Sequence, residues 1–138
     1  MTEHQQTGKL STGIHRILLV DDEEMIREMT REILTYLGYE VVVASGGEEA
    51  IDIYKREKEH IDLLIVDLIM PKMNGVACFE QIRNLDKEVP IVISSGISEI
   101  TKKESILKMG AAAYIEKPYT IDGLQSTLQS ISMSHTEP

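Results

Sequence analysis

Residues 17–22 read Ile-Leu-Leu-Val-Asp-Asp and decide the fold, because a short, wholly apolar run ends here in two carboxylates. A strand buried on both faces has this composition, and such strands occur in parallel sheets covered by helices on both sides. Residues 61–66 (IDLLIV) repeat the pattern and end in Asp67. Further strands are expected at 39–44 (YEVVVA), at 91–94 (IVIS, opened by Pro90) and at 112–116 (AAYIE).

Apolar residues at helical spacing fill the segments between these strands. Residues 24–37 carry such a pattern, and Gly38 follows as a helix stop. The other helices are expected after a Ser45-x-x-Glu48 capping box, after the turn at 71–75, near 99–109, and after Thr120 as a cap.

Five strand–helix units in succession predict an α/β fold with a doubly wound parallel sheet of five strands. Right-handed crossovers leave few topologies, of which the flavodoxin-like (βα)5 order 2-1-3-4-5 is the leading one. We expect one domain over residues 14–132, with loose tails at 1–13 and 133–138.

Composition excludes several classes of function. The 138 residues suit a single domain, and 14 Lys plus Arg against 23 Asp plus Glu give a net charge of −9. That charge disfavours direct contact with nucleic acid or an anionic membrane. No apolar stretch approaches the roughly 18 residues of a spanning helix, and no secretory signal is visible. Cys78 is alone, which fits a reducing compartment, so a cytoplasmic location is expected.

Polar residues follow the strands at what becomes one edge of the sheet, where ligands bind in such folds. Asp21 and Asp22 follow the first strand, Asp67 the third, Ser94 and Ser95 the fourth, and Lys117 the fifth. Three carboxylates at one place repel one another unless a cation joins them, and hard oxygen ligands suit Mg²⁺. With a lysine nearby, this set favours transfer of a phosphoryl group to a carboxylate. No nucleotide-binding glycine loop is present, so no other cofactor is expected.

The chain resembles the receiver domains of two-component response regulators, of the stand-alone single-domain type. The resemblance covers nearly the whole domain in the order of the family. Its motifs are ILLVDDEEMIRE (17–28), LGYEVVVASGGEEA (37–50), LLIVDLIMPKMNG (63–75), PIVISSG (90–96) and GAAAYIEKP (110–118).

The resemblance implies a role for each residue at the edge. Asp67 accepts phosphate from a phosphohistidine, while Lys117 pairs with the phosphoryl group. Asp22 binds Mg²⁺ directly, Asp21 does so directly or through water, and Asp67 and the backbone carbonyl of Ile69 complete the metal ligands. The chain is then not an enzyme toward other molecules, because it catalyses only its own phosphoryl transfer and dephosphorylation.

The resemblance also implies a conformational switch. Its hydroxyl is Ser95, five residues after Pro90, although Ser94 is the alternative. Tyr114 is the aromatic residue that turns inward on activation, and Pro118 follows a cis peptide bond that aims Lys117 at the site. The face made by the helix near 99–109, the strand at 112–116 and the last helix is then remodelled.

The implied partners are a sensor histidine kinase or a histidine phosphotransfer protein, and an unidentified protein target. The chain ends soon after the last helix, so we expect it to act in trans, as a monomer or as a dimer formed on phosphorylation. The alternative is a docking module of the same fold that works without phosphate. An enzyme such as a flavodoxin is disfavoured by the few aromatic residues, and an aspartate-nucleophile phosphatase by Ile69, where that class has a second acid.

Plainer interpretations exist for single residues. The acidic run at 21–24 also suits a helix N-terminus, where negative charge is favourable. Tyr114 also suits a half-buried packing position.

Overall fold

A computed structural model describes residues 13–96 and 102–136. Within them the strands form one parallel sheet in the order β2-β1-β3-β4-β5, which confirms the predicted fold class and topology. The strands are β1 (Arg16–Val20), β2 (Glu40–Ala44), β3 (Leu63–Asp67), β4 (Ile91–Ser95) and β5 (Ala113–Glu116).

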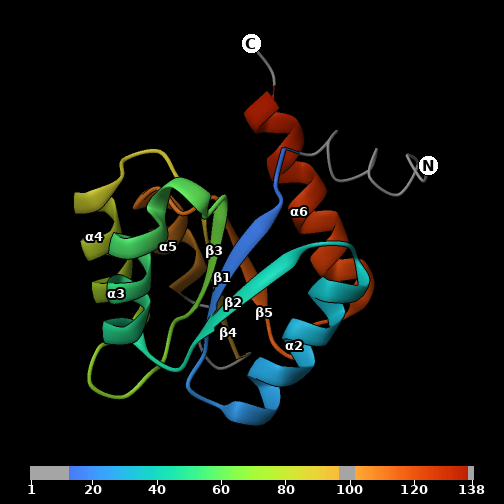
Figure 1. The fold of residues 1–138 in the computed structure, drawn as a ribbon. Coiled ribbons are helices and arrows are strands. Elements are labelled where there is room, and N and C mark those ends of the chain that lie inside the picture. The colour runs from blue at the N-terminus through green and yellow to red at the C-terminus, as the bar shows by residue number, and fades with distance from the viewer. Residues whose placement is uncertain (1–12, 97–101, 137–138) are drawn as a thin grey trace.

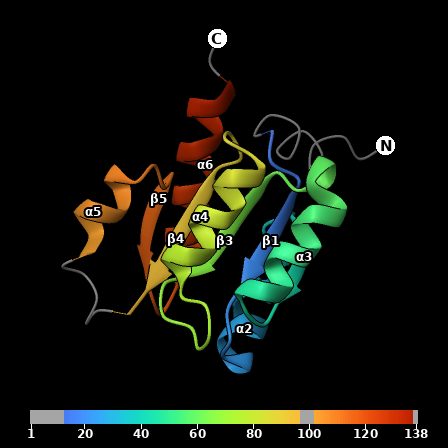
Figure 2. The same ribbon diagram turned by 90° about the vertical axis from the view of Figure 1, so that its left-hand side faces the viewer.

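Helices cover both faces of this sheet. Helices α2 and α6 lie on one face, and α3, α4 and α5 lie on the other (Figure 1). A view rotated by 90° about the vertical axis shows α3, α4 and α5 side by side in front of the sheet (Figure 2). The helices are α2 (Glu24–Tyr36), α3 (Gly47–Glu57), α4 (Gly75–Leu85), α5 (Lys103–Lys108) and α6 (Ile121–Thr136), and a short 3-10 helix covers Lys58–His60.

The central strands read as unbroken apolar runs because they feed two separate cores. In β1, Leu18 and Val20 belong to the core under α3, α4 and α5, whereas Ile17 and Leu19 belong to the core under α2 and α6. Successive side chains of a strand point to opposite faces, so a strand covered on both sides must be apolar at every position. β3 alternates in the same way and is buried over its whole length.

Two local predictions about helix starts had different outcomes. The predicted capping box is wrong, because Gly46 is the N-cap of α3 and the Ser45 hydroxyl donates to Glu49 at 2.9 Å. The predicted cap at Thr120 is confirmed by its hydroxyl oxygen, which accepts from the Gly123 N–H at 2.9 Å. The helix expected near 99–109 is seen as α5, and residues 97–101 lie outside the described part of the chain.

Among the described residues, no helix is long and apolar enough to cross a membrane.

Gly75 sets how closely α4 approaches the end of β3. A Cβ atom at this position would lie 2.5 Å from the Asp67 carbonyl oxygen and 2.7 Å from the Leu68 Cα. Both obstacles are backbone atoms, so a side chain here would push the strand end away from its place. The close approach is fixed by the Gly75 N–H, which donates to the Leu68 carbonyl at 2.8 Å.

We therefore expect Gly75→Ala to lower the free energy of unfolding by about 1–3 kcal/mol, the usual cost of overpacking. Urea denaturation followed by circular dichroism measures the change. Gly96→Ala is the matched control, because a Cβ there meets no atom of the described residues within 4 Å. Equal stability of the two variants would contradict the proposed steric role of Gly75.

Candidate functional site

The strand register brings the predicted acidic residues to one edge of the sheet. Val20 pairs with Val66 between β1 and β3, so the next residues, Asp21 just after β1 and Asp67 at the end of β3, lie side by side. Both carboxylates are nearly buried, with 1% of Asp21 and 4% of Asp67 exposed. The sheet therefore places two acids where water screens their charges poorly.

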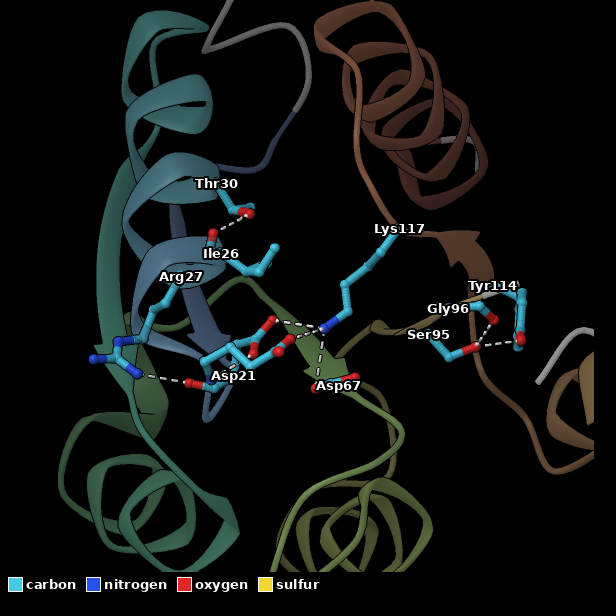
Figure 3. Close-up of polar contacts among 10 residues, drawn as sticks. Asp21, Ile26, Arg27, Thr30, Asp67, Ser95, Gly96, Tyr114 and Lys117 are labelled. Carbon is cyan, nitrogen blue, oxygen red and sulfur yellow. Dashed lines mark hydrogen bonds and ion pairs between the residues drawn. The ribbon is translucent and has the colours of Figure 1, made fainter. Parts of the chain in front are cut away.

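Lys117 joins the two acids. Its Nζ lies 3.1 Å from the Asp21 Oδ2 and 3.1 Å from the Asp67 Oδ2 (Figure 3). The Lys117 N–H donates to the Ser95 carbonyl at 2.8 Å, which continues the pairing of β4 with β5 up to this residue. Burial alone would lower the pKa of Lys117, but the Asp67 and Asp21 carboxylates outweigh burial and raise it. The lysine is therefore a permanent positive charge at the site.

The donor atoms fit a divalent cation. Asp21, Asp22 and Asp67 each offer a carboxylate oxygen, and these oxygens lie within 4.8 Å of one another. All are hard oxygen ligands, the kind that Mg²⁺ takes in proteins. Among the described residues, the Asp22 carboxylate makes no hydrogen bond or ion pair. This carboxylate is thus available to a metal without losing another contact.

Burial changes the charge state of Asp67. It raises the pKa of Asp67 to about 6, against the opposing effect of Lys117, and the neighbouring Asp21 adds to the rise. The folded protein therefore holds the Asp67 proton more tightly than the unfolded chain does. At neutral pH the ionised Asp67 carboxylate lowers the free energy of unfolding, and this loss of stability disappears when the carboxylate is protonated.

In metal-free buffer, Asp67→Asn is expected to raise the free energy of unfolding near neutral pH by about 1–3 kcal/mol. The difference in free energy of unfolding between the variant and the native protein should shrink as the pH falls through about 6, because Asp67 of the native protein then becomes neutral as well. Denaturant titrations of both proteins across this range measure the difference. A constant difference at every pH would show that the carboxylate is not the cause.

The two adjacent serines of β4 lie in different surroundings. The Ser95 hydroxyl hydrogen-bonds with the Tyr114 hydroxyl and donates to the Gly96 carbonyl at 3.3 Å (Figure 3). The Ser94 hydroxyl is fully buried and lies near the buried Tyr119 hydroxyl instead. The structure thus brings Ser95 and Tyr114 together and leaves Ser94 out of this pair.

A cleft of about 550 Å³ opens beside the acids. Its lining includes Asp22, Asp67, Lys117 and Ile69, a residue that is 54% exposed. The Lys117–Pro118 peptide bond is cis, as predicted. The cleft has room for a phosphoryl group next to the Asp67 carboxylate.

Two contacts of the site were not predicted from the sequence. The Glu23 Oε1 lies 3.5 Å from the Lys117 Nζ, and Glu23 also lines the cleft. Arg27 donates from Nη1 to the Asp21 carbonyl oxygen at 2.8 Å. Glu23 belongs to the acidic run at 21–24, so the sequence could have indicated it as a residue of the site. Arg27 gave no such signal, because its contact depends on how α2 leaves β1.

Comparison with known families gives one match. The model of the response regulator receiver domain matches residues 17–129. A curated relative, "Probable transcriptional regulator ycf27" of Cyanidium caldarium, is 38% identical over 117 residues, which are 85% of this chain and 46% of the relative. The chain thus spans about half the length of the curated relatives it matches.

Solved structures agree with this match. A response regulator receiver domain protein from Clostridium thermocellum superposes with a TM-score of 0.83 at 27% identity, covering 88% of this chain and 97% of that one. The CheX–CheY–BeF3–Mg complex from Borrelia burgdorferi has a TM-score of 0.81 at 30% identity, covering 88% and 92%.

Proposed function

This chain belongs to the response regulator receiver domain family, and from that premise we propose that it is a phosphorelay switch in the cytoplasm. It receives a phosphoryl group on Asp67 from a phosphohistidine. The observation that carries the proposal is the position of the Lys117 Nζ, 3.1 Å from both the Asp21 and Asp67 carboxylates.

The chemistry follows from these residues. An Asp67 carboxylate oxygen attacks phosphorus, a P–O bond forms, and the P–N bond of the phosphohistidine breaks as its electron pair returns to the imidazole. Lys117 stays beside the phosphoryl oxygens and stabilises their charge in the transition state. The reaction needs no proton from Asp67, so the ionised carboxylate is the reactive form.

The acidic residues have a second role, which is to hold a divalent cation. Mg²⁺ held by Asp21, Asp22, Asp67 and the backbone carbonyl of Ile69 would supply positive charge to the crowded carboxylates and the phosphoryl oxygens. The carboxylate oxygens of Asp21, Asp22 and Asp67, which lie within 4.8 Å of one another, support the acidic part of this ligand set. The similar CheY of Borrelia burgdorferi was solved in a complex with Mg²⁺.

Ser95 and Tyr114 then communicate the new charge. A serine hydroxyl donates one hydrogen bond and accepts others, so Ser95 can donate to a phosphoryl oxygen while it accepts from Tyr114. The pair seen in the structure supports their joint movement. A covalent charge at Asp67 thereby biases the equilibrium between two arrangements of this pair.

The proposed partners follow from this switch. A sensor histidine kinase or histidine phosphotransfer protein supplies the phosphoryl group, and the face formed by α5, β5 and α6 contacts a protein target. With a net charge of −9, this chain does not itself contact nucleic acid. It catalyses only its own phosphoryl transfer and dephosphorylation, and it is a monomer or dimerises on phosphorylation.

Incubation with Mg²⁺ and a small acyl phosphate tests the proposal. The expected result is one phosphoryl adduct in the intact mass, located at Asp67 by peptide mapping and absent when EDTA removes the metal. No adduct, with the fold intact by circular dichroism, would favour the alternative of a docking module that works without phosphate.

Ile69 lines the cleft two residues after Asp67, and its apolar side chain cannot hydrogen-bond to an attacking water. We therefore expect Ile69→Asn to shorten the half-life of the phosphorylated protein about fivefold, the effect of one neutral hydrogen bond of about 1 kcal/mol. Loss of the adduct over time, followed by intact mass, measures the half-life. Ile69→Leu is the matched apolar control, and an unchanged half-life in the Asn variant would contradict the expectation.

A further inference from the structure

Arg27 connects helix α2 to the strand end that carries the acidic pair. Its Nη1 donates to the backbone carbonyl of Asp21 at 2.8 Å (Figure 3). The Arg27 N–H is fixed in turn by the Glu23 carbonyl at 2.9 Å, within the first turn of the helix. The partly buried guanidinium therefore ties α2 to the last peptide group before Asp22.

Asp21 is held at every polar group that it has. Its N–H donates to the Ala44 carbonyl at 3.1 Å, its Oδ1 accepts from the Glu23 N–H at 2.9 Å, and its Oδ2 accepts from the Lys117 Nζ at 3.1 Å. The carbonyl oxygen is the remaining group, and Arg27 is its donor.

The neighbouring Asp22 is held differently. Its carboxylate lines the cleft and makes no hydrogen bond or ion pair within the described residues. Because no hydrogen bond holds the carboxylate, the backbone is what decides the direction in which the side chain leaves the Asp22 Cα. That backbone is fixed on one side by the turn between Asp21 and Glu23, and on the other by the peptide plane whose carbonyl Arg27 binds.

We infer that Arg27 is a positioning residue for the metal site, because it fixes the peptide plane that aims the Asp22 carboxylate into the cleft. The inference rests on the proposed function, since it requires Mg²⁺ to bind the acidic pair. Without Arg27 the Asp21 carbonyl is free to turn toward water. The Asp22 carboxylate then occupies several directions, and ordering it on binding costs free energy.

Arg31 provides a matched control on the same helix. It lies one turn further on and pairs with Glu28 at 2.6 Å, with 40% of its side chain exposed. Substituting either arginine with Met removes one guanidinium and one set of hydrogen bonds while keeping the apolar stem. Of these two arginines, Arg27 alone hydrogen-bonds to the peptide group between Asp21 and Asp22.

The experiment is a calorimetric titration of the full chain with MgCl2, in the absence of any phosphodonor. Relative to the native protein, we expect Arg27→Met to raise the Mg²⁺ dissociation constant about tenfold, the usual effect of losing a residue that orients a metal ligand. Arg31→Met should leave the constant unchanged. Arg27→Lys keeps a donor and a charge and should lie between the native protein and Arg27→Met.

Thermal unfolding of the metal-free proteins separates positioning from folding. Weaker Mg²⁺ binding in a folded Arg27→Met, with the lysine variant intermediate, supports the inference. If Arg27→Met does not fold, the lysine variant decides the test. Weaker Mg²⁺ binding by a folded Arg27→Lys supports the inference, and a native Mg²⁺ dissociation constant in that variant overturns it. An unchanged Mg²⁺ dissociation constant in Arg27→Met, or an equal loss of Mg²⁺ affinity in Arg31→Met, overturns the inference and leaves the proposed function intact. A native protein that binds no Mg²⁺ overturns both.

Discussion

Asp67→Asn is expected to take up no phosphoryl group, either from a small acyl phosphate or from a phosphorylated histidine kinase. An amide oxygen is a poor nucleophile. The neighbouring Asp21 carboxylate does not line the cleft, and its Oδ1 and Oδ2 already accept hydrogen bonds from the Glu23 N–H and from Lys117. Intact mass after incubation with Mg²⁺ and the donor measures the adduct. Phosphotransfer profiling against candidate kinases extends the measurement to natural donors.

Asp52→Asn is the matched control, because it makes the same chemical change at an exposed position of α3. It should accept phosphate like the native chain. Circular dichroism of the Asp67 variant in the assay buffer shows whether it is folded, so that unfolding is excluded as the cause of a lost adduct. Persistence of the adduct in Asp67→Asn would move the acceptor to another residue.

Lys117→Met is expected to slow phosphoryl transfer about 10²- to 10³-fold, the usual effect of removing one group that stabilises transition-state charge. It should also lower the free energy of unfolding in metal-free buffer by about 3 kcal/mol, because Asp21 and Asp67 lose their shared cation in a buried site. The rate of adduct formation and a denaturant titration measure the two effects.

Added Mg²⁺ separates these effects of Lys117. The metal should restore much of the stability, because it offsets the same carboxylates, but it should leave the transfer rate low. Lys55→Met is the control, since Lys55 is an exposed lysine of α3 away from the cleft. A native transfer rate in Lys117→Met would remove the lysine from the proposed mechanism.

The sequence was most informative where one physical requirement limited the choice of residues. A strand covered on both faces is apolar on both faces, so the strands at residues 17–20 and 61–66 were identifiable without coordinates. The alternation of strands with helices then gave the sheet order. Carboxyl ends of parallel strands share one edge, so Asp21, Asp67 and Lys117 were predicted to meet, as their distances show.

Local signals of hydrogen bonding were less reliable. The Ser45–Glu48 pattern had the spacing of a capping box, yet the helix begins at Gly47, one residue later than that box requires, and Ser45 bonds to Glu49. A shift of one residue changes which side chain meets which backbone group, and packing against the neighbouring loop decides that shift. Gly47 packs so closely there that a Cβ atom would lie 2.6 Å from the Met73 sulfur.

The sequence by itself determined the order of strands and helices, the two apolar cores and the set of charged groups at one edge, because periodicity and strand ends encode them directly. Only the tertiary structure decided that Lys117 bridges two acids, that Ser95 and not Ser94 meets Tyr114, and that Arg27 holds the Asp21 carbonyl. These contacts join residues of different elements. Their geometry depends on the angles at which packed elements meet, which no spacing along the chain specifies.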